Sequence, residues 1–486
     1  MYQLTESDLD TTADDHNPAI RAAANPDSAV LEALLARYKS RRDDKTLNEY
    51  EQRALTRCSP SATIAIFAHM NLAENLRLLL DAGADPNGIQ RWEAADYSVR
   101  YMRGRDPLDY YNSHASCEKR SVVLAKARAS GIVHPICPLT EAELEERRCW
   151  FPTFLTEFLV PGRSLRMMRD LTVLEEAAGY GRRDLFDLLR AAGADESAWV
   201  QQPESDDPEL WNFDESAPLS FLSTSSPLHE ALFWGEQAMV RHLLTTCGHS
   251  PNYRPRAVPT MALPPLSHIL VRCNLNDDSV HNCLLDLLAH PQLDPNIRTP
   301  VFGIHPLHFA TAHHKPALLT WLASFIPGGL AAAGATALGH TLLHVACLPL
   351  TPYQIDATKP DIIKSIHCIR TVNYYWRPWG NKIASQDPQP LTVAEQQAQL
   401  ATIRVLVEGG VADVMAKDFD GNTALHYLAG TLNMAKETIE LLRGLAGGEE
   451  VWQEGKNRWD MTPSRLWGRR RISHLQTFIS SYTVSR

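Results

Sequence analysis

The sequence predicts an all-α protein in which short helix-turn-helix units stack on one another. Two features carry this prediction: a turn-and-helix phrase that recurs along the chain, and a second apolar phrase that ends in glycine. The first phrase is clearest at residues 418–429, where Gly421 follows an acidic turn and Thr423 precedes a short apolar stretch. Glycine permits a backbone conformation that a side chain disfavours, and a hydroxyl at a helix start satisfies a backbone N–H group. The phrase is therefore predicted to be a turn that leads into a helix.

The first phrase recurs at residues 226–231, 305–310 and 339–346, and the second is found at residues 78–87 and 188–195. Together they resemble the Gly-x-Thr-Pro-Leu-His-x-Ala phrase and the glycine-capped second helix of the ankyrin-repeat family. The resemblance implies an ankyrin-repeat solenoid with β-turn tips. Its structural positions would be filled by Leu174, Gly181, Pro227, Leu228, His229, Pro306, Leu307, His308, Thr341, His344, Gly421, Thr423, Leu425 and His426.

The chain is predicted to fall into four parts. Residues 1–16 form an acidic disordered tail, and residues 17–134 form degenerate N-terminal repeats. Residues 135–165 break the period and are interpreted as an irregular helical spacer. Residues 166–486 form the main array, with an insertion at 349–390 and a basic C-terminal cap. One long solenoid and two arrays joined by a hinge are both compatible with this order.

Individual units differ in how well they keep the pattern. The best formed unit covers residues 171–195, where Glu175 stands in place of the usual histidine. An acidic loop follows at 197–226, after which the regular units resume. The unit that begins at Thr341 is interrupted by the insertion, so its second helix is expected only at residues 394–408.

The composition is that of an ordinary globular protein. The 486 residues are 44% hydrophobic and 21% charged, and no apolar run is long enough to span a membrane. Nine cysteines without a C-x-x-C pair indicate reduced thiols, and the acidic N-terminus does not resemble a signal peptide. A cytoplasmic or nuclear protein is expected. The net charge of −10 argues against binding nucleic acid or an anionic membrane.

The resemblance implies that the exposed turn tips and first helices bind a partner protein, whose identity it does not specify. Tyrosine, tryptophan and arginine are favoured at such interfaces because they bury large areas or make several hydrogen bonds. The aromatic residues of the insertion fit this description, although an insertion folded back over the solenoid would need the same residues. The candidate contacts are Tyr375, Trp376, Arg377, Trp379, Tyr253, Arg254, Arg298 and Phe419.

No catalytic phrase is present: there is no G-x-S-x-G, no phosphate-binding loop and no H-E-x-x-H. Among the histidines of residues 305–314, His308 has the structural role of the repeat, and His313 and His314 are adjacent, so a metal site is not expected there. Cys273, His281 and Cys283 match no zinc module. No cofactor or metal is therefore expected. Ser473 follows an arginine pair and resembles a site for basophilic kinases.

The sequence predicts a monomeric, non-enzymatic scaffold or adaptor. The alternative from another class is the substrate-recruiting subunit of an enzyme complex, such as a ubiquitin ligase adaptor. An enzyme formed by the insertion is the third interpretation, and it would need a pocket with converging polar groups.

Overall fold

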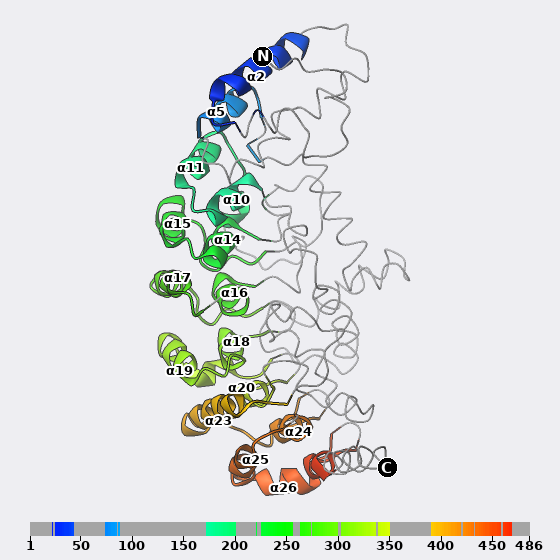
Figure 1. Cartoon of the computed structure of the whole chain (residues 1–486). Coiled ribbons are helices and arrows are strands. Elements are labelled where there is room, and N and C mark those ends of the chain that lie inside the picture. The colour runs from blue at the N-terminus through cyan, green and yellow to red at the C-terminus, as the bar shows by residue number, and fades with distance from the viewer. Residues whose placement is uncertain are drawn as a thin grey trace, which may run out of the picture. The chain divides into compact units, whose positions relative to one another are not determined.

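The computed structural model describes residues 22, 25–42, 73–84, 86–87, 172–200, 220, 225–255, 263–273, 275–299, 303–336, 339–349, 390–418, 421–431, 433–457 and 460–468. These residues are helical and contain no β-strand, which confirms the all-α class (Figure 1). The predicted tail, the spacer, most of the insertion and the chain beyond residue 468 lie outside the described residues.

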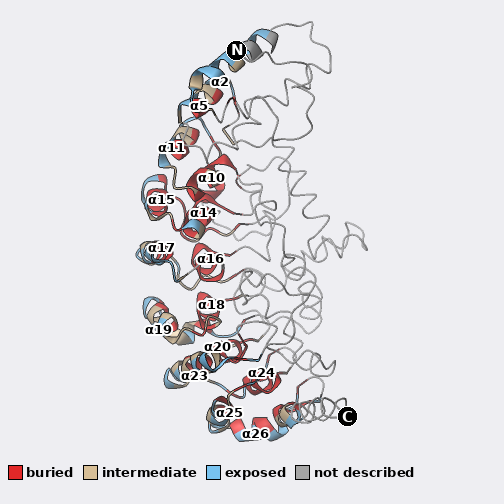
Figure 2. Cartoon of the chain, viewed as in Figure 1, coloured by how far each residue is buried: buried red, intermediate tan, exposed pale blue. Residues whose placement is uncertain are grey.

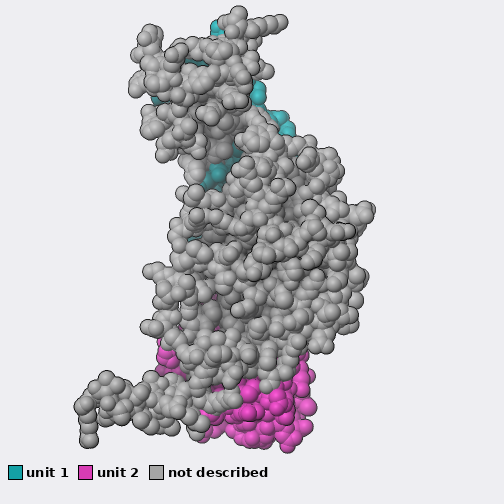
Figure 3. Space-filling view, turned by 90° about the vertical axis from the view of Figure 1, so that its right-hand side faces the viewer, with its two compact units in different colours: residues 1–101, 165–269, 273–293 teal, residues 102–164, 270–272, 294–486 magenta. Residues whose placement is uncertain are grey.

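The chain divides into two compact units (Figure 3). Unit 1 comprises residues 1–101, 165–269 and 273–293, and unit 2 comprises residues 102–164, 270–272 and 294–486. The helices of unit 1 are α2 (Ser28–Arg42), α5 (Ala73–Asp81), α10 (Val173–Gly179), α11 (Arg183–Ala191), α12 (Ser197–Val200), α14 (Pro227–Trp234), α15 (Gln237–His242), the π-helix η6 (Leu243–Cys247), most of α16 (Pro265–Arg272), and α17 (Asp278–Leu288).

Unit 1 is built from pairs of helices that pack on each other. α10 packs on its partner α11 and on α14, the first helix of the next pair, while α15 packs on α14 and α17. Ala177 and Ala178 are buried in α10, and a side chain at Gly179 would press on the indole of Trp234. The small residues of α10 therefore let the two first helices approach closely.

Unit 2 repeats the pairwise packing. α18 packs on α19 and α20, α20 packs on α23 and α24, and α24 packs on α25. The helices are α18 (Pro306–Thr311), α19 (Pro316–Phe325), the 3₁₀-helix η8 (Gly329–Ala333), α20 (Leu342–Ala346), α23 (Val393–Glu408), α24 (Ala424–Gly430), α25 (Lys436–Arg443), α26 (Gly448–Glu454) and a helix at residues 463–468. The delayed second helix predicted after the insertion is thus confirmed as α23, which packs on α20.

The two helices of a pair are buried to different extents (Figure 2). All residues of α18 and of α24 are buried, whereas only Leu319 and Leu322 are buried in α19. A helix that is apolar on all sides must lie inside, and a helix with one apolar stripe faces water on the other side. The first helices therefore form the core, which the second helices cover on one side.

Four first helices share a hydrogen-bond arrangement centred on a histidine near the helix start. In α24, Nδ1 of His426 accepts the backbone N–H of Thr423 at 3.0 Å, and Nε2 lies 3.0 Å from the carbonyl oxygen of Met461. Since Nδ1 accepts, Nε2 carries the proton and donates. The equivalent pairs are His229 with Leu263, His308 with His340, and His344 with Asn422.

Each of these carbonyls lies just before the next first helix, so every histidine connects two consecutive pairs. The partners are separated by 34, 32 and 35 residues in three cases, and by 78 residues across the insertion. Among the predicted structural positions, Gly181 and Gly421 adopt positive φ angles of 68° and 74°, and Leu174, Leu228, Leu307 and Leu425 are buried.

Candidate functional site

The predicted partner contacts fall into two groups. Tyr375, Trp376, Arg377, Trp379 and Phe419, and the predicted modification site Ser473, lie outside the described residues.

The three predicted contacts that the structure describes are Tyr253, Arg254 and Arg298. Tyr253 is only 6% exposed, with its ring 6.2 Å from that of His229 and its hydroxyl donating to the carbonyl of Ser220 at 3.5 Å. The expectation of an exposed tip is therefore wrong for Tyr253, because its ring packs into the core. Arg254 is half-buried.

Arg298 has a structural role in unit 2. Its guanidinium donates to the carbonyls of Gly303 at 2.9 Å, Ala332 at 3.0 Å and Ala333 at 2.6 Å. The last two belong to η8, whose terminal carbonyls have no partner within the helix. The side chain therefore fastens η8 to the turn at residues 298–303, which is a use that the sequence pattern did not indicate.

We expect Arg298→Met to lower the free energy of unfolding by about 1 to 3 kcal/mol, because the part-buried carbonyls lose a charged donor. Arg298→Lys should recover only part of this loss, since one ammonium group cannot reproduce the planar fork of donors. Urea unfolding followed by circular dichroism measures both variants. Equal stability of Arg298→Met and wild type would show that water replaces the guanidinium without cost.

A partly exposed aromatic pair, Tyr180 and Trp234, lies at the ends of α10 and α14 in unit 1. Trp234 is 48% exposed, and its ring stacks on that of Tyr180 with centroids 6.4 Å apart and an interplanar angle of 19°. Phe233 contacts Trp234 edge to face at 5.1 Å. The sequence carries a signal for this pair, because Tyr180 and Trp234 both directly precede the glycine that ends a first helix.

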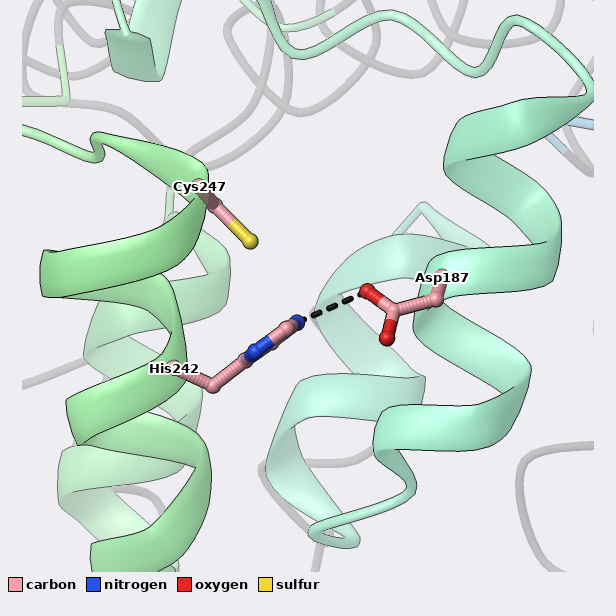
Figure 4. Close-up of side chains that lie close together, drawn as sticks. All are labelled: Asp187, His242 and Cys247. Carbon is pink, nitrogen blue, oxygen red and sulfur yellow. Dashed lines mark hydrogen bonds and ion pairs between the residues drawn. The ribbon is translucent and has the colours of Figure 1, made fainter.

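A second cluster in unit 1 contains Asp187 of α11, His242 of α15 and Cys247 of η6 (Figure 4). Nε2 of His242 lies 2.7 Å from Oδ1 of Asp187, and one ligand atom from each of the three residues lies within 4.8 Å of the others. Cys247 and His242 are buried, whereas the Asp187 side chain is 51% exposed. We call these three residues the Asp-His-Cys cluster.

Charged residues surround the Asp-His-Cys cluster. Nη2 of Arg183 lies 3.5 Å from Nδ1 of His242, and Arg190 donates to Glu196 at 2.6 Å. Glu196 also accepts from Nε2 of the buried His249 at 3.3 Å. Although its partial burial acts in the opposite direction, these two hydrogen bonds hold the pKa of Glu196 below its usual value. The positive charges of Arg183 and Arg190 thus balance the negative charges of Asp187 and Glu196 around the histidines.

The combination of cysteine, histidine and aspartate also occurs in thiol hydrolases, where a thiolate acts as nucleophile. Burial raises the pKa of the Cys247 thiol to about 11, so this thiol is protonated at neutral pH. Reactive cysteines have the opposite property, with a lowered pKa and access to solvent. The geometry therefore does not support nucleophilic catalysis by Cys247.

Sequence reasoning did not find this cluster, and the cysteines and histidines it considered are placed elsewhere. Cys273 donates to the carbonyl of Leu232 at 3.5 Å, and burial raises the pKa of Cys283 to about 12. His305 lies 3.0 Å from Oδ1 of Asn296, and His313 lies 2.6 Å from the carbonyl of Leu270. Cys273, His305 and His313 are thus used in other hydrogen bonds. None of these four residues belongs to the one metal-ligand group found among the described residues.

The chain matches no protein-family model, and no curated protein is significantly similar to it. Of the helices that the structure describes, none combines the length and the apolar character needed to cross a membrane.

Proposed function

We propose that this chain is an ankyrin-type repeat protein that binds a partner protein and has no catalytic activity of its own. The observation that carries the proposal is the set of four histidines that bond the start of one first helix to the carbonyl before the next. Their separations of 34, 32 and 35 residues match the ankyrin period of 33 residues. In such arrays each pair is stabilised by its neighbours, which leaves the exposed residues free to vary for recognition.

The aromatic pair of Tyr180 and Trp234 is the described surface best suited to such a partner. Tryptophan and tyrosine contribute most often to binding energy because a rigid ring buries a large area with little loss of rotamer freedom. Trp234 leaves about half of its surface in water. We place the protein in the cytosol or nucleus, in accord with the free thiols of Cys247, Cys273, Cys283 and Cys347.

We expect Trp234→Ala to weaken partner binding by about 2 kcal/mol, or roughly 30-fold, since hot-spot residues contribute at least this much. The experiment is affinity capture of the full chain from its native cells, with mass spectrometry, followed by titration of the captured partner. Leu285→Ala on α17 is the matched control, because Leu285 is also an exposed apolar residue, at 38%, on the second helix of a pair.

Loss of the partner with Trp234→Ala and its retention with Leu285→Ala would support binding through the first helices. A triple change of Trp376, Arg377 and Trp379 to alanine tests the insertion as a second contact. If neither variant alters the set of captured proteins, or if no protein is captured specifically, the proposed function is contradicted.

A further inference from the structure

We propose that Asp187, His242 and Cys247 bind one divalent transition-metal ion of the zinc type. This site stands apart from the proposed function, because it lies on second helices and needs no partner protein. Imidazole, thiolate and carboxylate are the three side-chain ligands that zinc uses in proteins, and a site with three protein ligands leaves the fourth position to water. Figure 4 shows the three side chains directed toward a common space between α11 and the α15–η6 segment.

The π-helix η6 supplies an observation independent of the ligand types. His242 and Cys247 are five residues apart, and in a regular α-helix such residues would point about 140° away from each other. In η6 the N–H of Gly248 bonds to the carbonyl of Leu243, which is the i to i+5 pattern of a π-helix. The wider turn places Cys247 above His242 on the side that faces α11. π-turns are rare and frequently occur at functional sites.

The distances require only small movements to hold an ion. In a tetrahedral zinc site the sulfur and nitrogen ligands would be roughly 3.6 Å apart, and the nitrogen and oxygen ligands roughly 3.4 Å. The three atoms here lie within 4.8 Å of one another, and the histidine and aspartate atoms are 2.7 Å apart. The sulfur therefore has to approach by up to about 1.2 Å, and the carboxylate oxygen has to withdraw from the imidazole nitrogen by about 0.7 Å. The exposed side chain of Asp187 is able to make this change by rotation.

The charges around the site also fit a divalent cation. On binding, the metal–sulfur bond replaces the S–H bond of Cys247 and the proton leaves to water, so that thiolate and Asp187 together neutralise the ion. For His242 to coordinate through Nε2, the proton that Nε2 donates to Asp187 has to move to Nδ1, which makes the Nε2 lone pair available to the ion. Arg183 opposes this arrangement, because its guanidinium lies 3.5 Å from Nδ1 of His242. Its side chain is exposed and must move away when the ion binds.

The alternative interpretation is that Asp187 and His242 form a structural hydrogen bond with a buried thiol beside it. The two interpretations predict different results for Arg183→Ala. If the cluster binds a metal ion, removing the positively charged guanidinium of Arg183 should raise the affinity for that ion a few-fold. A purely structural cluster binds no metal ion in either protein.

The experiment uses the reduced, chelator-treated full chain titrated with Co²⁺ under anaerobic conditions. We expect one Co²⁺ per chain at this site, a thiolate-to-cobalt charge-transfer band, and displacement of the cobalt by Zn²⁺. Cys247→Ser should remove the band, while Cys283→Ser, which changes another buried thiol of the same unit, should retain it. Asp187→Asn should weaken Zn²⁺ binding at least about tenfold, the lower end of the loss caused by removing even an outer partner of a ligand.

Because Asp187 is exposed, Asp187→Asn tests the site even if Cys247→Ser fails to fold, and circular dichroism verifies the fold of each variant. Absence of the charge-transfer band in the wild-type protein would overturn the proposal. So would a band that persists in folded Cys247→Ser, or a Zn²⁺ affinity that Asp187→Asn leaves unchanged.

Discussion

Asp418→Ala is expected to lower the free energy of unfolding by about 3 to 5 kcal/mol, the usual cost of removing one partner from a buried charged network. The Asp418 side chain is 0% exposed. Its Oδ1 accepts the backbone N–H of Asn422 at 2.8 Å, and its Oδ2 accepts the amide of Asn422 at 3.3 Å and the hydroxyl of Tyr427. Alanine would leave these buried donors without their acceptor, and each such loss is costly in a low-dielectric interior.

The network around Asp418 extends to two further loops of unit 2. Nε2 of His340 lies 3.8 Å from Oδ2 of Asp418, and Asn457 donates to the side chain of Asn422 at 2.9 Å. Asp418 therefore connects the turns that precede α20, α24 and the helix at residues 463–468. Removal of the Asp418 carboxylate is therefore expected to loosen the packing of all three first helices.

Two variants make the Asp418 measurement decisive. Asp413→Ala is the matched control in the same loop, because Asp413 is exposed and accepts a single hydrogen bond, from Met415 at 2.9 Å. It should change stability by less than about 1 kcal/mol. Asp418→Asn keeps one acceptor oxygen, so its loss of stability should lie between those of Asp418→Ala and Asp413→Ala. Urea unfolding provides the three values, and an Asp418→Ala loss no larger than that of the control would contradict this role.

Acid is expected to destabilise unit 2 steeply between pH 6.5 and pH 4. Burial lowers the pKa of His314, His340 and His426 to about 4 and that of His305 to about 3. The unfolded chain has the ordinary value of about 6.5, so it binds protons in this range while the native state does not. Stability therefore falls as the pH drops through 6.5, and the loss stops below the native pKa.

The size of the acid effect follows from the number of such histidines. Each histidine lowers the free energy of unfolding by about 1.4 kcal/mol per pH unit in this range. The four together therefore lower it by about 5 kcal/mol between pH 6 and pH 5. This is comparable to the whole stability of an ordinary domain. Urea unfolding at pH 7.5, 6.5 and 5.5 measures the slope.

His426→Gln provides the control for the acid measurement. The amide can replace both ring nitrogens, donating to Met461 and accepting from Thr423, but it does not titrate. The free energy of unfolding of His426→Gln should therefore change less steeply with pH than that of the wild-type protein, by the equivalent of about one bound proton. A stability that stays constant from pH 7.5 to pH 5.5 in the wild-type chain would contradict the prediction.

The sequence determined the helix class and the places where the first helices begin. Thr341, Thr423 and the histidines that follow them are recognisable because a cap uses residues only three positions apart. The same local signals located α23 beyond the insertion. A side chain that hydrogen-bonds to the backbone a few residues away can be assigned from the sequence alone.

The roles of the remaining side chains depend on contacts between distant parts of the chain. Tyr253 was predicted to be exposed and is buried against His229, because the depth of a turn depends on the neighbouring unit. Asp187 and His242 are 55 residues apart in the chain, and a π-turn turns Cys247 toward them. Hydrogen bonds within a turn are specified by neighbouring residues, whereas contacts between helices depend on how distant segments pack. The helix starts could therefore be predicted, and the Asp-His-Cys cluster could not.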